Sequence, residues 1–200
     1  MPAAPAASPS FSICVYCGSR PGADPAFAEA AQGVGRWIGQ HGGQLVYGGG
    51  RSGLMGVVAN ATLAAGGRVV GVIPKALVDR EQAHRGCTEL HVVDTMHERK
   101  RRMAERADAF LALPGGIGTM EEFFEIWTWH QLGYHGKPVG LLNVGGYYDA
   151  LLQFMHTGVR AGFMDAAQMR TVATGAQWQS LLPELVERAG FTAPTQIGPI

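Results

Sequence analysis

The sequence predicts a doubly wound α/β fold, in which helices cover both faces of a parallel sheet. From residue 11 to about residue 190, short apolar runs alternate with amphipathic segments. The apolar runs are nearly continuous in Val, Ile and Leu, which is typical of parallel strands buried on both faces. Glycine-rich turns follow several of the runs, and no repeat or linker interrupts them. We therefore expect a single domain over residues 11–190.

The first half of this domain contains the clearest strand and helix signals. In chain order we expect strand Ser12–Tyr16, helix Pro25–His41, strand Gln44–Tyr47, helix Leu54–Ala65 and strand Arg68–Ile73. The first helix carries Phe27, Val34 and Ile38 in an apolar stripe at helical spacing. The second helix stops before a pair of glycines, and Pro74 closes the strand that follows.

The second half begins with a segment, Lys75–Glu89, that has no clean period and is expected to lie near the edge of the sheet. In chain order we then expect strand Leu90–Val93, helix His97–Ala107, strand Ala109–Leu113, helix Thr119–Leu132, strand Val139–Asn143, helix Tyr148–Arg160 and a last helix over residues 177–189. In such a sheet, ligands bind where the carboxyl ends of the strands meet the N-termini of helices.

Composition excludes several classes of partner. Lys and Arg together number 16, as do Asp and Glu, so the formal net charge is zero and a nucleic-acid partner is not expected. No apolar stretch reaches the ~18 residues that span a bilayer, so we expect no membrane partner. Residues 1–10 are rich in Ala, Pro and Ser and lack the pattern of a signal peptide. We expect residues 1–10 to be a disordered tail and residues 191–200 to be loose.

The cysteines indicate a reducing compartment. Cys14, Cys17 and Cys87 are odd in number and show no disulfide framework, which favours the cytoplasm. Cys14 and Cys17 form a C-x-x-C that lies within and just beyond a strand, and no second pair of ligands accompanies it. The histidines are not at metal-ligand spacing either, so we predict no metal site.

Two glycine-rich loops follow predicted strands. Residues 48–56 (GGGRSGLMG) follow Gln44–Tyr47, and residues 114–119 (PGGIGT) follow Ala109–Leu113. Glycine lets the backbone approach an anion closely, and the next helix adds free N–H groups. Thr119 can cap its helix and donate its hydroxyl to a phosphate. Neither loop matches the fingerprint of an NTPase or a dinucleotide site, and tight packing without a ligand is the alternative.

The helix after the second loop combines acidic and apolar residues. Glu121, Glu125 and Thr128 fall at i, i+4 and i+7 and share one polar stripe. The rest of the helix is apolar almost all round, so it is expected in the core or in a subunit interface. A carboxylate on such a helix, beside an anion cradle, is costly unless it is used. The alternative is that Glu121 and Glu122 only complement the helix dipole.

A basic run opens the helix His97–Ala107. Arg99 and Lys100 lie near its start, where cations oppose the helix dipole, so an anionic ligand is a better explanation for them. Arg101 and Arg102 are expected on a solvated face.

These motifs resemble the Lonely Guy family of cytokinin riboside 5′-monophosphate phosphoribohydrolases, many once labelled lysine decarboxylases. The resemblance rests on P-G-G-x-G-T-x-x-E over residues 114–122, on MHERK over residues 96–100 and on the glycines of residues 48–56, and it covers roughly residues 11–188. Nothing in the chain resembles a pyridoxal-phosphate site with its Schiff-base lysine, so we expect no cofactor.

The resemblance implies a Rossmann-like, cytoplasmic, homodimeric hydrolase. Such an enzyme cleaves the N-glycosidic bond of N6-substituted AMP, and often of AMP itself, and releases a free base and ribose 5-phosphate. The base preference stays open, as does the choice between cytokinin production and nucleotide recycling.

The resemblance also assigns residues. The catalytic positions are Arg99, Glu121 and Glu122, and the substrate-binding positions are Glu81, Lys100, Gly115, Gly116, Gly118, Thr119 and Thr128. The glycines and Thr119 would hold the 5′-phosphate, and the two glutamates would face the ribose and the attacking water. The motif favours Glu122 as the essential carboxylate, whereas the polar stripe favours Glu121. Ile117 stands where an aromatic residue is common in the family.

The main alternative is a non-catalytic carrier of a nucleotide or cofactor with the same fold. A carrier needs the glycine loops but neither Arg99 nor the glutamates, so their presence favours an enzyme. A purely structural oligomer would leave both glycine loops unexplained.

Overall fold

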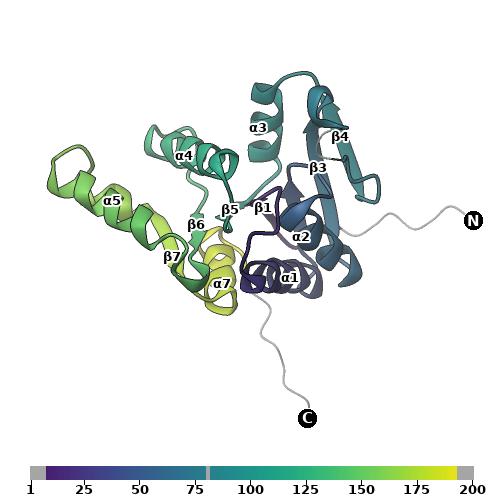
Figure 1. Ribbon diagram of the computed structural model, residues 1–200, viewed down its shortest axis with the longest axis horizontal. Coiled ribbons are helices and arrows are strands. Elements are labelled where there is room, and N and C mark those ends of the chain that lie inside the picture. Colours follow the sequence, from purple (N-terminus) through teal and green to yellow (C-terminus); the bar gives the residue numbers. More distant parts are fainter. Residues whose placement is uncertain (1–7, 80–81, 193–200) are drawn as a thin grey trace, which may run out of the picture.

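A computed structural model of the chain describes residues 8–79 and 82–192, so most of the two predicted tails lies outside the described residues. The strands form one seven-stranded sheet in the order β4-β3-β2-β1-β5-β6-β7, and each neighbouring pair is parallel (Figure 1). The strands are β1 Ser12–Tyr16, β2 Gln44–Tyr47, β3 Arg68–Pro74, β4 Glu89–Val93, β5 Ala109–Ala112, β6 Val139–Leu142 and β7 Val172–Gly175. The predicted doubly wound α/β fold is confirmed.

Helices cover both faces of the sheet (Figure 1). They are α1 Pro25–Gln40, α2 Gly53–Ala64, α3 Met96–Glu105, α4 Ile117–Gln131, α5 Asp149–Arg160, α6 Ala166–Thr171 and α7 Trp178–Arg188, with short 3-10 turns η1 Lys75–Leu77 and η2 Val144–Gly146. Alternate side chains of β1 enter different cores, as the pleat of a strand requires. Ile13 and Val15 pack with α1, α2 and α7, whereas Cys14 and Tyr16 pack with α3, α4 and α5.

The structure moves several predicted element ends by one or two residues and adds two elements. Helix α4 begins at Ile117 with Gly116 as its N-cap, so Thr119 lies in the first turn and does not cap the helix. Helix α6 and edge strand β7 were not predicted. Both elements are short, and of residues 166–175 only Val172 and Ala173 are buried, so the sequence contains no apolar run or stripe there. The segment before β4 does lie at the sheet edge, where β4 is the outermost strand.

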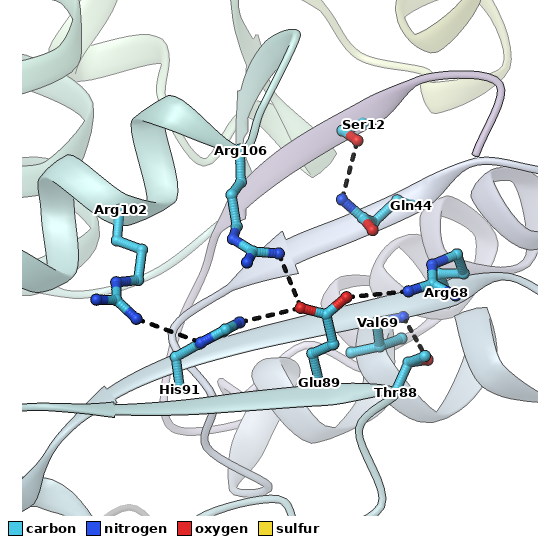
Figure 2. Close-up of polar contacts among 9 residues, drawn as sticks. All are labelled: Ser12, Gln44, Arg68, Val69, Thr88, Glu89, His91, Arg102 and Arg106. Atoms are coloured by element: carbon cyan, nitrogen blue, oxygen red, sulfur yellow. Dashed lines mark hydrogen bonds and ion pairs between the residues drawn. The ribbon is translucent and has the colours of Figure 1, made fainter. Parts of the chain in front are cut away.

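An ionic network holds the C-terminal end of α3 against this edge (Figure 2). Glu89 of β4 accepts hydrogen bonds from Arg68 at 3.0 Å, from Arg106 at 2.9 Å and from Nε2 of His91 at 3.1 Å. Arg102 donates to Nδ1 of His91 at 3.3 Å. Burial alone would raise the pKa of Glu89, but these donors outweigh it and lower the pKa below its ordinary value.

Among the residues that the structure describes, no helix combines the length and the apolar character that crossing a membrane requires.

Candidate functional site

A cavity of about 700 Å³ opens at the carboxyl ends of β1 and β5. The strand order reverses between these two neighbours, and the crevice at such a point is the usual ligand site of a doubly wound fold. Residues 17–22 after β1 and residues 114–119 after β5 both line it, and the two loops are joined by a hydrogen bond from the N–H of Gly18 to the carbonyl of Pro114 at 3.1 Å. Arg99 of α3, Glu122 of α4 and Tyr147 after β6 complete much of the wall.

The glycines of the loop after β5 have different roles. A Cβ at Gly115 would overlap the side chain of Thr119, so packing requires glycine there. A Cβ at Gly116 or Gly118 would meet no atom within 4 Å, and neither residue has a positive φ. Neither packing nor backbone conformation therefore explains glycine at these two positions. The open space beside them is the cavity itself.

The same loop presents the N-terminus of α4 to the cavity. The N-cap residue is Gly116, which has no side chain that could accept a hydrogen bond from the backbone N–H groups of the first turn. That turn begins with Ile117, Gly118 and Thr119. The N–H groups of a first turn have no partner within the helix and carry its positive end. Thr119 is buried, and it lines the cavity as well. The arrangement is suited to an anion such as a phosphate.

The charged side chain of Arg99 is buried, with only 5% of the residue exposed, and hydrogen bonds to two backbone carbonyls hold it in place. Its Nε donates to the carbonyl of Val72 at the end of β3, and its Nη2 donates to the carbonyl of Gly48 after β2, each at 3.2 Å. A Cβ at Gly48 would overlap Nη2, so glycine at this position makes room for the guanidinium. The two carbonyls offset the free-energy cost of burying the guanidinium charge. The remaining nitrogen of Arg99, Nη1, lies 3.6 Å from Oε1 of Glu122.

The first glycine loop otherwise serves packing. Gly49 and Gly53 have positive φ, and a Cβ at Gly53 or Gly56 would overlap neighbouring backbone. The alternative of close packing is therefore the better explanation of this loop, although Leu54 and Met55 reach the cavity.

The two consecutive glutamates of α4 have different surroundings. The side chain of Glu122 is 13% exposed, lines the cavity and faces Arg99. Glu121 is 48% exposed and contacts Nζ of Lys100, which also lies 3.2 Å from Glu125. Burial acts to lower the pKa of Lys100, but hydrogen bonds to the two carboxylates outweigh it and raise that pKa above its ordinary value. Lys100 and Glu121 thus join α3 to α4 and do not line the cavity.

Two further predicted residues lie elsewhere. Thr128 is exposed, donates to the carbonyl of Phe124 at 2.7 Å and does not line the cavity. Glu81 lies outside the described residues.

Sequence reasoning missed the wall that follows β1, including Ser19 and Arg20, and the rings of Phe27 and Tyr147. The strand order would have pointed to residues 17–22, because β1 lies beside β5 in the sheet. No motif in the sequence pointed to Tyr147.

The cysteine pair is split between the two sides of β1. Cys14 packs in the core with α4, whereas Cys17 packs on the other face and reaches the cavity. Burial raises the pKa of both thiols, so Cys17 stays protonated beside the site at neutral pH.

A second cavity of about 730 Å³ lies beside residues 82–86 and is lined by basic side chains. Two of its basic side chains already make hydrogen bonds: Nε of Arg51 donates to Gln82 at 2.9 Å, and the ring of His84 contacts Asn60 at 2.9 Å. The cavity between β1 and β5 contains the arginine–glutamate pair and the open glycines, so it is the better candidate.

Comparison with known proteins identifies the family of the chain. The family model described as possible lysine decarboxylase matches residues 55–185. A cytokinin riboside 5′-monophosphate phosphoribohydrolase of Rhodococcoides fascians is 52% identical over 157 residues, which are 78% of this chain and 79% of that protein. A protein of the same name from Arabidopsis thaliana is 47% identical over 175 residues, which are 88% of this chain and 81% of that protein.

Solved structures show the same fold at greater distance. The molybdenum cofactor carrier protein of Chlamydomonas reinhardtii superposes with a TM-score of 0.65 at 20% identity, and the match covers 90% of this chain and 98% of that one. At this identity the likeness concerns the fold alone. The family match and the curated relatives, by contrast, extend over most of the chain. The chain belongs to the Lonely Guy family, whose model still carries the description possible lysine decarboxylase.

Proposed function

We propose that this protein hydrolyses the N-glycosidic bond of nucleoside 5′-monophosphates whose base is an N6-substituted adenine, and that it accepts AMP. The products are the free base and ribose 5-phosphate. The observation that carries the proposal is one cavity that joins two unexplained glycines, Gly116 and Gly118, to a buried Arg99–Glu122 pair. The printed names of the relatives agree with this activity.

The 5′-phosphate is assigned to the N-terminus of α4. The absent side chains of Gly116 and Gly118 let the anion reach the backbone, and the free N–H groups of the first turn donate to its oxygens. Thr119 adds its hydroxyl, while Gly115 keeps the loop packed against Gly18. A nucleoside without the phosphate forfeits these contacts.

The chemistry is assigned to Glu122 and Arg99. Cleavage breaks the bond between C1′ and the base nitrogen, passes through an oxocarbenium-like state and adds water at C1′. The carboxylate of Glu122 orients that water, accepts its proton and stabilises the positive charge. Because arginine is a poor proton donor at neutral pH, Arg99 is assigned to stabilise the electron pair that leaves with the base nitrogen. The departing base takes its proton from solvent, and Glu122 returns to solvent the proton that it accepted from the attacking water.

Glu121 and Lys100 are assigned a supporting role. Their contact, together with Glu125, fixes α3 against α4 and thereby fixes the distance between Arg99 and Glu122. The roles of Glu81 and Thr128 in binding substrate stay predictions from the family.

We also propose a homodimer. Helix α5 projects beyond the edge of the sheet (Figure 1), and Met155 is its only buried residue. Phe154 on this helix and Phe163 just after it are 71% and 90% exposed. Large exposed apolar side chains on a chain without net charge favour self-association. The dimer is expected in the cytoplasm, where its three cysteines remain thiols.

Incubation with AMP and with N6-isopentenyl-AMP, followed by chromatography of the free base, tests the activity. The matching nucleosides serve as controls. We expect release from the monophosphates and at least a hundredfold less from the nucleosides, and the ratio of the two monophosphate rates gives the base preference. Binding of AMP without release of adenine would contradict hydrolysis and favour a carrier.

A further inference from the structure

Two consecutive tyrosines after β6 hold the loop that follows β5. The hydroxyl of Tyr148 donates to the carbonyl of Leu113 at 2.6 Å, and the hydroxyl of Tyr147 donates to the carbonyl of Gly115 at 2.7 Å. Tyr148 is fully buried, and burial raises the pKa of its hydroxyl. Tyr147 is 45% exposed and stands in the wall of the cavity. The inner tyrosine thus belongs to the core, and the outer one belongs to the site.

A glycine turn directly before the two tyrosines sets their position. Gly145 and Gly146 have φ values of +58° and +76°, a left-handed conformation that favours glycine. Asn143 braces the turn, because its Oδ1 accepts from the backbone of Tyr148 at 2.7 Å and its Nδ2 donates to Asp149 at 2.7 Å. This turn carries the chain from β6 back toward the neighbouring loop.

The ring of Tyr147 contacts two other aromatic rings. It meets the ring of Phe27 edge-on, with centroids 5.4 Å apart, and the ring of Tyr148 edge-on, with centroids 4.8 Å apart. Such contacts fix the ring plane and therefore the direction of the hydroxyl. The hydrogen bond to Gly115 is consequently made by a preorganised donor.

The carbonyl that accepts from Tyr147 belongs to the same peptide group as the N–H of Gly116, and both residues line the cavity. In a planar trans peptide, the carbonyl of Gly115 and the N–H of Gly116 point in opposite directions. If this peptide rotated, a carbonyl dipole would replace the N–H on the side where an anion is to bind. Glycine on both sides offers little steric resistance to such a rotation.

We propose that Tyr147 is a positioning residue, a latch that keeps the Gly115–Gly116 peptide oriented for the 5′-phosphate. The inference rests on the proposed function, because it requires the phosphate at the N-terminus of α4. The latch acts on binding of the phosphate and not on the bond that breaks. Its loss therefore raises KM and leaves kcat nearly unchanged.

The test is Tyr147→Phe, which keeps the ring and removes only the hydroxyl. Loss of one neutral hydrogen bond predicts a rise in KM for AMP of about three- to tenfold, with kcat within about twofold of wild type. The inhibition constant of ribose 5-phosphate is expected to rise by the same factor, while that of free adenine stays constant. Tyr134→Phe is the matched control, because Tyr134 is 75% exposed and lies outside the cavity lining.

A second variant keeps the inference testable if the first folds poorly. Phe27→Leu removes a ring that contacts Tyr147. This variant is also expected to raise the inhibition constant of ribose 5-phosphate, as Tyr147→Phe does. Equal affinities of wild type and Tyr147→Phe for ribose 5-phosphate would overturn the latch, as would a fall in kcat and in melting temperature at constant KM. If wild type itself does not bind ribose 5-phosphate, the proposed function fails together with the latch.

Discussion

Glycine is placed in the loop after β5 for two distinct physical reasons. Gly115 is required by its contact with Thr119, which a Cβ would overlap. Gly116 and Gly118 are required by nothing within the described chain, since a Cβ at either would meet no atom within 4 Å. Gly118 lies in the first turn of α4, where glycine is less favourable than alanine, and nothing within the described residues requires it there. The proposed function supplies a reason for glycine at positions 116 and 118, which is close approach of the phosphate to the backbone.

Gly118→Ala is expected to affect the stability of the fold and the binding of AMP in different ways. Alanine is preferred over glycine in a helix by up to about 1 kcal/mol, so the free energy of unfolding is expected to stay constant or to rise. The added methyl group occupies the approach of the phosphate, so KM for AMP is expected to rise at least tenfold. Steady-state kinetics and thermal unfolding measure both effects. Gly136→Ala is the control, because a Cβ there also meets no atom within 4 Å; an unchanged KM in Gly118→Ala would contradict the assignment.

The consecutive glutamates of α4 provide a matched pair of variants. Glu122→Gln is expected to lower kcat by about 10²- to 10⁴-fold, the usual contribution of a general acid–base group. Glu121→Gln is expected to lower kcat by less than about tenfold, because Glu121 contacts Lys100 outside the cavity. Single-turnover rates with AMP measure both. A larger loss in Glu121→Gln than in Glu122→Gln would reverse the assignment.

At the scale of elements, α3 and α4 are joined by two neighbouring ion pairs. Arg99 faces Glu122 within the cavity, and the next residue, Lys100, contacts Glu121 and Glu125 outside it. The outer contacts are well placed to hold the inner pair, because the side chain of Lys100 is only 12% exposed. In the proposed mechanism, catalysis depends on this relation between two helices, which no single element determines.

Lys100→Met tests the joint between the helices. The substitution leaves two carboxylates facing an apolar side chain, so the helices are expected to separate slightly and the melting temperature to fall. We expect kcat to decrease about tenfold with little change in KM, because misplaced reacting groups raise the free energy of the transition state. Arg101→Met is the control, since Arg101 is 71% exposed on the same helix. Lys100→Met with full kcat would show that the joint is not needed.

The sequence predicted the elements that carry a strong apolar signal. The predicted bounds of β1 and β2 agree with the structure at every residue, because buried parallel strands are continuous apolar runs. It did not predict α6 and β7, whose short and exposed residues carry no such signal. The start of α4 was placed at Thr119 instead of Ile117, since Gly116 provides no capping side chain to mark it.

At the scale of the whole molecule, the site is assembled from loops that only the topology brings together. Arg99 and Glu122 were predicted from local motifs, yet their opposition across the cavity depends on where α3 and α4 pack on the sheet. Tyr147 was not predicted, because its role follows from the adjacency of β5 and β6 and not from any pattern in its own segment.

The ionic network at the sheet edge makes the stability of the whole molecule depend on pH. The pKa of Glu89 is lowered from its ordinary value of 4.5 in the folded state. A carboxylate with a lowered pKa contributes stability that is fully present above its unfolded pKa and is lost as the pH falls through the folded pKa. The network therefore stabilises the fold at neutral pH and stops doing so in acid.

Glu89→Gln is expected to lower the melting temperature at pH 7 and to lose this difference from wild type as the pH falls below about 4.5. Thermal unfolding from pH 7 to pH 3 measures the convergence. Glu105→Gln is the control, because Glu105 is 66% exposed and only pairs with Arg101 at 3.7 Å. A constant difference between Glu89→Gln and wild type at every pH would contradict the linkage.

The most direct test of the central claim is the position of the phosphate in a crystal structure of Glu122→Gln with AMP. This variant is expected to keep the nucleotide intact. We expect phosphate oxygens on the N–H groups of residues 116–119, with C1′ facing residue 122 and the guanidinium of Arg99 beside the base. A phosphate in the second cavity, beside Arg51 and Arg85, would contradict it.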